Sequence, residues 1–162
     1  MSEKKIYEII AFYEFKRHDA LEDKKMRLRI ALTDNSVCGT IILAEEGYNG
    51  SLCGLPSDIA RFIETAEEIL ETTIAYKSSF HNEKPFRKHE VKIKPEIVTL
   101  KQNVDISKGA GTHVSPTKWN ALISDPETVV LDTRNFYEVK NGTFRGAVDP
   151  ETEKFSDLPQ FV

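Results

Sequence analysis

The order of strand-like and helix-like segments over the first hundred residues constrains the fold more than any other feature of this sequence. Dense or alternating apolar residues predict strands, and apolar residues three and four positions apart predict helices. The predicted strands cover residues 5–16, 37–44, 50–53, 73–80 and 90–100, and the predicted helices cover residues 20–33 and 55–71. The chain therefore reads strand, helix, strand, strand, helix, strand, with one strand added.

This order is the split βαβ, or ferredoxin-like, pattern of the α+β class. It predicts an antiparallel sheet with two helices on one face and the other face left available. Pro95 limits the last strand to an edge or a break. Asp19 and Glu22 form a capping-box pattern at the start of the first helix. The second helix has an apolar stripe at helical spacing, formed by Ile59, Phe62, Ile63, Ala66, Ile69 and Leu70.

The two middle strands are predicted to form a hairpin. A turn at residues 45–46 pairs Ala44 with Gly47. The same register brings Cys38 near Cys53. In a reducing compartment we expect both to remain thiols.

A linker is predicted over residues 101–113, which hold glycine and serine with little apolar pattern. It separates a domain over residues 1–100 from a segment over residues 114–162. In that segment Ser115 and Pro116 mark the start of a short helix.

Three apolar residues of this short helix are predicted to form its buried face. They are Trp119, Leu122 and Ile123. Further along we predict a short buried strand over residues 128–131, a helix over residues 135–142 and a strand that begins at residue 147.

Composition narrows the function classes. The chain is 40% hydrophobic and 30% charged with a net charge of −4, as in ordinary soluble globular proteins. Apolar runs are strand-sized and no signal peptide is visible, so we expect a cytoplasmic protein without a membrane segment. The cysteines and histidines show no metal-ligand spacing, so the sequence predicts no metal and no cofactor. It indicates no oligomeric state.

Two stretches carry a family resemblance. The first reads Ala-Glu-Glu-Gly-Tyr-Asn-Gly-Ser-Leu over residues 44–52. The second comprises residues 111–116, residues 119–120, residues 131–134 and Glu138. Together they resemble the rhodanese-containing tRNA uridine 5-hydroxylases, in order and over nearly the whole chain.

The resemblance implies an oxygen-dependent enzyme that converts the wobble uridine of certain tRNAs to 5-hydroxyuridine. It implies a ferredoxin-like (acylphosphatase-like) domain over residues 1–100 and the N-terminal part of an α/β rhodanese-like domain over residues 114–162. The implied partner is tRNA.

In that family the required cysteine belongs to a rhodanese loop. No cysteine follows Cys53 here, and the sequence ends at Val162, so we assign no catalytic residue and expect this portion to be inactive alone. Two alternatives stay open: a rhodanese-type sulfurtransferase in its full form, and a stand-alone RNA-binding or interaction module. Residues 143–145 depart from the His-Ile-Pro of most rhodanese domains, which disfavours simple thiosulfate sulfurtransfer.

Asp132, Arg134 and Glu138 are candidate residues at the border of a rhodanese pocket. Ligands of open α/β sheets bind outside the carboxyl ends of strands, where Asp132 and Arg134 are predicted to lie. An ion pair from Arg134 to Glu138 would fix this corner. Alternatively, these residues only brace the turn between strand and helix.

A basic segment over residues 77–94 is the candidate RNA-binding element. Its six cations face two carboxylates, and phenylalanine and histidine are interleaved. The candidates are Lys77, Lys84, Arg87, Lys88, Lys92 and Lys94. A solvated edge strand is the alternative, since edge lysines discourage sheet-to-sheet pairing.

The turn over residues 45–50 supplies two further candidates, Tyr48 and Asn49. They offer a ring for stacking and an amide for a nucleobase. A hairpin turn alone explains the glycines of this stretch but not these two residues.

Overall fold

The computed structural model describes residues 5–102 and 111–161. They form two compact units, Met1–Ile97 and Val98–Val162, and each is described by itself. Most of the predicted linker, residues 103–110, lies outside the described residues, so the predicted domain limits stay predictions. No helix in the described part of the chain is both long and apolar enough to cross a bilayer.

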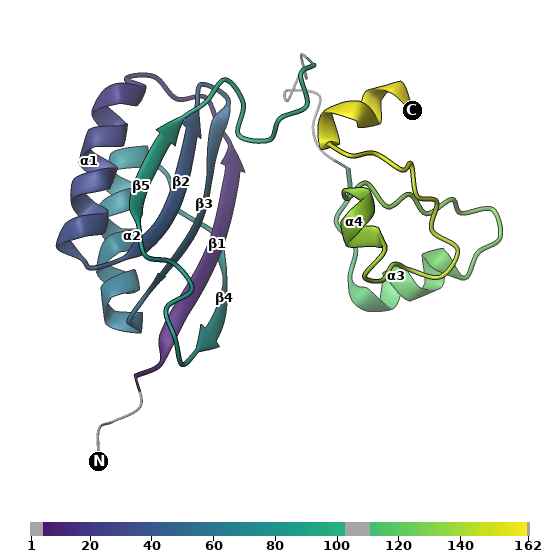
Figure 1. The fold of residues 1–162 in the computed structure, drawn as a ribbon, viewed down its shortest axis with the longest axis horizontal. Coiled ribbons are helices and arrows are strands. Elements are labelled where there is room, and N and C mark those ends of the chain that lie inside the picture. The colour runs from purple at the N-terminus through teal and green to yellow at the C-terminus, as the bar shows by residue number, and fades with distance from the viewer. Residues whose placement is uncertain (1–4, 103–110, 162) are drawn as a thin grey trace. The chain divides into compact units, whose positions relative to one another are not determined.

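The first unit is a five-stranded sheet with two helices (Figure 1). Its elements follow the predicted order. They are β1 (Tyr7–Phe15), α1 (Leu21–Asp34), β2 (Cys38–Ala44), β3 (Gly47–Gly54), α2 (Pro56–Leu70), β4 (Tyr76–His81) and β5 (His89–Ile93). Across the sheet the strands lie in the order β4, β1, β3, β2, β5.

The prediction of a wholly antiparallel sheet is wrong at β5. Four strands pair antiparallel, but β5 pairs parallel with β2, with Val91 opposite Ile41. The cause is the connection after β4, which reverses the chain and carries it from one edge of the sheet to the other. The sheet is therefore mixed. The expectation that Pro95 limits this strand to an edge is confirmed.

Both helices cover the same face of the sheet, as Figure 1 shows. All six residues of the predicted stripe of α2 are buried there. They pack against apolar residues of α1 and the strands, among them Ile10, Leu28, Leu32, Ile41 and Leu52. Each such side chain contributes about 1.5–3 kcal/mol through burial, so packing rather than capping holds the helices in place.

The start of α1 differs from the predicted capping box. Ala20, in the left-handed region at φ 48°, is the N-cap and supplies no side-chain acceptor. The Asp19 carboxylate instead lies 3.6 Å from the ammonium group of Lys24, which is buried. Met26 and Ile30 of α1 are exposed.

The predicted hairpin register is confirmed. Ala44 pairs with Gly47, and Cys38 pairs with Cys53. Both cysteines are buried and carry free thiols in the structure. The second strand of the hairpin begins at Gly47, three residues earlier than predicted.

The second unit contains α3 (Pro116–Ile123), α4 (Phe136–Val139) and a short 3-10 helix, η2 (Phe155–Gln160). The Ser115 side chain accepts a hydrogen bond from the backbone N–H of Lys118, as its predicted capping role requires. The buried face predicted for α3 is wrong, since none of its residues is buried. The described residues of this unit form no sheet, only a single parallel bridge between Leu131 and Val148. Helix α3 therefore has no sheet face to pack against.

Candidate nucleic-acid interface

The sheet face that carries no helix, here called the open face, presents a row of side chains from β1. Strand alternation sends Ile10 and Phe12 to the helices, and Ala11, Tyr13 and Phe15 to the open face. Tyr13 is 61% exposed and Phe15 is 45% exposed. Two large aromatic rings therefore meet solvent on a strand inside the sheet.

The basic segment does not form one compact patch. Lys77 lies on β4 and Lys92 on β5, the two edge strands. Four strand spacings separate these edges, about 19 Å. The connection between them carries Lys84, Arg87 and Lys88, and Lys94 follows β5 directly. The structure thus distributes the predicted cations over both edges of the sheet and the connection between them, and Lys88 lines a pocket with Arg29 and Thr33 of α1.

Lys84 shows that this connection crosses the open face. Its Nζ donates to the Ser36 carbonyl oxygen at 3.2 Å, lies 3.9 Å from Cys38 Sγ, and sits 5.5 Å from the centre of the Tyr7 ring. Since Tyr7 and Ser36 lie at the same end of the sheet, the connection covers that end.

The two cysteines lie under this connection. The Cys53 thiol donates to the Phe86 carbonyl oxygen at 3.8 Å, and burial raises the pKa of Cys53. A raised pKa keeps this thiol protonated and unreactive at neutral pH. We therefore assign the cysteines a packing role.

The stacking role predicted for Tyr48 is wrong. The side chain is 1% exposed, and its ring packs on Phe12 and His18 on the helix side of the sheet. Its hydroxyl donates to a carboxylate oxygen of Glu14 at 2.8 Å, and burial is the main cause of its raised pKa. Asn49, one residue later, points to the open face and is half-buried.

Helix α2, on the other face of the sheet, is acidic. Within α2, Asp58, Glu64, Glu67 and Glu68 face a single cation, Arg61. An anionic partner is therefore repelled from α2 and attracted to the cations around the open face.

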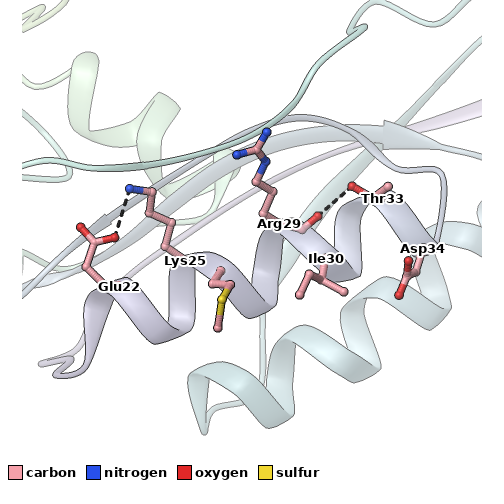
Figure 2. A pocket seen from close by; sticks show the side chains of 7 residues that line it. Glu22, Lys25, Arg29, Ile30, Thr33 and Asp34 are labelled. Atoms are coloured by element: carbon pink, nitrogen blue, oxygen red, sulfur yellow. Dashed lines mark hydrogen bonds and ion pairs between the residues drawn. The ribbon is translucent and has the colours of Figure 1, made fainter.

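A groove along α1 is a competing pocket (Figure 2), with a volume of about 370 Å³. Its charged side chains balance, because Lys25 and Arg29 stand beside Glu22 and Asp34. Lys25 Nζ pairs with Glu22 Oε2 at 3.2 Å. The groove therefore has no charge preference for an anion, and we assign no function to it.

A pocket of about 610 Å³ in the second unit contains the predicted Asp132 and Arg134. Arg134 binds Asp132 in a bidentate manner, with Nε–Oδ1 at 2.9 Å and Nη2–Oδ2 at 2.6 Å. The predicted ion pair of Arg134 with Glu138 is wrong. Among the described residues the ion pair of Arg134 is with Asp132, and Glu138 turns back to accept hydrogen bonds from Asn135. The guanidinium group of Arg134 uses two of its N–H groups for the bidentate hydrogen bonds to Asp132.

Hydrogen bonds hold the Asp132 carboxylate in its charged form. Arg134, followed by the Thr143 hydroxyl at 2.7 Å, keeps the pKa of Asp132 well below its usual range. A lowered pKa in the folded state stabilises the fold at pH values above the ordinary pKa of 3.8. That contribution falls as the pH drops from there toward the lowered pKa.

We expect Asp132→Asn to lower the unfolding temperature of the second unit at pH 7, because Arg134 and Thr143 lose a charged acceptor. The difference from wild type should shrink as the pH falls below 4, because the Asp132 carboxylate of the unfolded wild-type chain begins to protonate there while that of the folded chain stays charged. The fluorescence of Trp119, the single tryptophan, reports this unfolding because its ring packs 4.9 Å from that of Phe144. Asp149→Asn is the control, and equal melting of both variants at all pH values would contradict the prediction.

Sequence reasoning missed Tyr13 and Phe15. The density of apolar residues in residues 5–16 predicts a strand, but it does not show which of its side chains lie on a face that no helix covers. Two aromatic residues at i and i+2 share one face, and the predicted topology leaves one face of the sheet without a helix. Those two facts together were the available signal.

The order of the elements and of the strands in the sheet defines an α+β domain of ferredoxin-like topology with a mixed sheet. A family model described as "UPF0176 acylphosphatase like domain" matches residues 7–97. The chain therefore belongs to the UPF0176 family.

Named relatives were found among curated proteins and solved structures. A tRNA uridine(34) hydroxylase from Synechocystis sp. is 42% identical over 158 residues, which cover 96% of this chain and 57% of that protein. The chain thus spans little more than half the length of this relative. Acylphosphatases from Bacillus subtilis and Coxiella burnetii match with TM-scores of 0.38 and 0.39 and identities of 11% and 12%. These matches cover 55% and 58% of this chain, and 98% and 100% of the acylphosphatases.

Proposed function

We propose that this chain is part of an enzyme that hydroxylates uridine 34 of tRNA to 5-hydroxyuridine, and that its first unit contacts the tRNA. The 42% identity to a tRNA uridine(34) hydroxylase supports the activity, which we propose for the whole protein that contains this chain. The proposed location is the cytoplasm.

One observation carries the RNA contact. The connection from β4 to β5 puts Lys84 over one end of the open face and carries Arg87 and Lys88 next to it in the sequence, while α2 on the other face is acidic. Neutralising phosphates with lysine and arginine releases counterions and dominates the affinity of most nucleic-acid interfaces. The open face has cations that can neutralise phosphates, and the face covered by α2 has carboxylates that repel them.

We further propose that residues 114–162 are the N-terminal part of a rhodanese-like domain. Leu131 and Val148 form a parallel bridge, the pairing with which a parallel sheet begins. Asp132 and Arg134 follow Leu131 directly, where ligands of such sheets bind. In this proposal they border the pocket of the whole enzyme, and no residue described here is assigned a catalytic role.

The test is to delete the gene that contains this chain and to measure 5-hydroxyuridine in purified tRNA by mass spectrometry. We expect position 34 to carry unmodified uridine in the deletion strain and the modification to return with the wild-type gene. Pseudouridine in the same tRNA is the control for general tRNA processing. An unchanged amount of 5-hydroxyuridine in the deletion strain would rule out the proposed activity.

A further inference from the structure

The open face contains a hollow of about 410 Å³. Its floor includes Ala11 and Ser51, whose small side chains leave room above the sheet. Tyr13, Asn49 and Lys77 stand around it. The hollow therefore combines an aromatic ring, an amide and an ammonium group around a low floor.

The two exposed rings of β1 lie next to each other in an edge-to-face arrangement. Tyr13 and Phe15 lie on the same face, with ring centres 6.5 Å apart and planes at 79°. Two neighbouring exposed rings favour a partner that covers them, because removing apolar surface from water is favourable. A nucleobase is a suitable partner, since every base presents a π-face to an aromatic ring.

Polar groups beside the rings suit the rest of a nucleotide. The Asn49 amide can both donate to and accept from a base edge, and the Lys77 ammonium group can meet a phosphate. No partner for either side-chain group lies among the residues that the structure describes. Lys92 at the opposite edge is held by Glu90, with Nζ and Oε2 3.2 Å apart. Lys77 is therefore the better candidate for a phosphate contact.

This arrangement favours unpaired RNA over a duplex. In a duplex the faces of the bases are stacked on one another, and only phosphates and groove edges are available. Exposed aromatic rings in the middle of a sheet, with cations at its edges, can contact both the bases and the phosphates of a single strand.

We propose that the open face binds an unpaired segment of RNA, with bases stacked on Tyr13 and Phe15 and a phosphate at Lys77. The inference rests on the proposed function, which supplies RNA as the partner, and adds the strandedness of the bound segment and the residues that stack. Tyr13 and Phe15 take the role that the sequence assigned to Tyr48.

The test compares Tyr13→Val with Phe80→Val in the 162-residue chain. Phe80 is a matched control, because it too is 61% exposed on a strand but stands on the side of the sheet that faces the helices. Valine keeps the β propensity at both positions. The probes are a fluorescein-labelled ten-nucleotide oligouridine strand and a ten-base-pair RNA duplex, followed by anisotropy.

We expect Tyr13→Val to weaken binding of the single strand by roughly 5- to 150-fold, the value of one stacked base. Duplex binding should change less than twofold, and Phe80→Val and Tyr13→Phe should bind the strand like wild type. Far-UV circular dichroism identifies a variant that fails to fold, and Phe15→Val then decides, because it removes the second proposed stacking ring and should also weaken binding of the single strand but not of the duplex.

Three results would overturn the inference. They are unchanged strand binding by Tyr13→Val, equal losses with strand and duplex, or a wild-type dimer in sedimentation that Tyr13→Val dissociates, which would mean that a second copy covers the face. These outcomes are separable from failure of the proposed function. If tRNA binding depends on Lys84, Arg87 and Lys88 but Tyr13→Val does not change binding of the single strand, the proposed tRNA contact is supported and the proposed stacking is ruled out.

Discussion

Replacing Lys84, Arg87 and Lys88 together with alanine is expected to weaken tRNA binding by roughly 100-fold or more at 0.1 M salt. Each phosphate contact contributes about 0.7–0.9 to the slope of log affinity against log salt. Losing three contacts therefore reduces the magnitude of the slope by about 2–3. At 0.1 M salt, a change of this size corresponds to a loss of affinity of roughly 100-fold or more. Titrations at several salt concentrations between 50 and 200 mM measure both quantities.

The matched control removes three cations from α1, as Lys25, Arg27 and Arg29 to alanine. It changes the net charge equally, but these residues stand on the helix that packs on the other face. We expect a small loss of affinity and little change in slope. Equal losses in both variants would show that only net charge matters, and no loss in the first would mean that the basic segment is a solvated edge.

Gly39→Ala is expected to destabilise the first unit by about 3 kcal/mol or more, from backbone strain and overpacking together. Gly39 has φ +143°, which L side chains rarely adopt, and an added Cβ would lie 2.1 Å from the Ser51 carbonyl oxygen and 2.8 Å from Leu52 Cα. Both atoms are backbone of β3, so no side-chain rotation relieves the clash. This is a large fraction of the 5–15 kcal/mol that typically holds a domain together.

Urea unfolding followed by circular dichroism measures this loss, with Gly54→Ala as the control. An added Cβ at Gly54 would meet side-chain atoms, Val37 Cγ2 at 3.2 Å and Ile59 Cδ1 at 3.4 Å, which can move by a few tenths of an ångström. We expect a cost of about 1 kcal/mol there. Equal stability of Gly39→Ala and wild type would contradict the register of β2 against β3.

Local pattern was sufficient for much of the fold. The stripe of α2 follows from helical spacing alone, and every residue in it is buried. The register of the hairpin follows from its turn, because a tight turn fixes which residues oppose one another.

What sequence reasoning got wrong depends on contacts between distant segments. Tyr48 is buried because its hydroxyl donates a hydrogen bond to Glu14 on β1 and its ring packs on Phe12. Nothing in the sequence of the turn predicts either partner. In the same way, Lys77 and Lys92 are 15 positions apart in one basic segment but lie on opposite edges of the sheet. Their separation follows from the parallel pairing of β5 with β2, which the sequence did not reveal.

The most direct test of the central claim, that tRNA is bound on the open face, is to map photocrosslinks from tRNA that contains 4-thiouridine. Crosslinked peptides identified by mass spectrometry report which side of the sheet contacts the RNA. We predict crosslinks within residues 7–15 and within the connection over residues 82–88. Crosslinks confined to α1 and α2, with none on those two segments, would contradict the account.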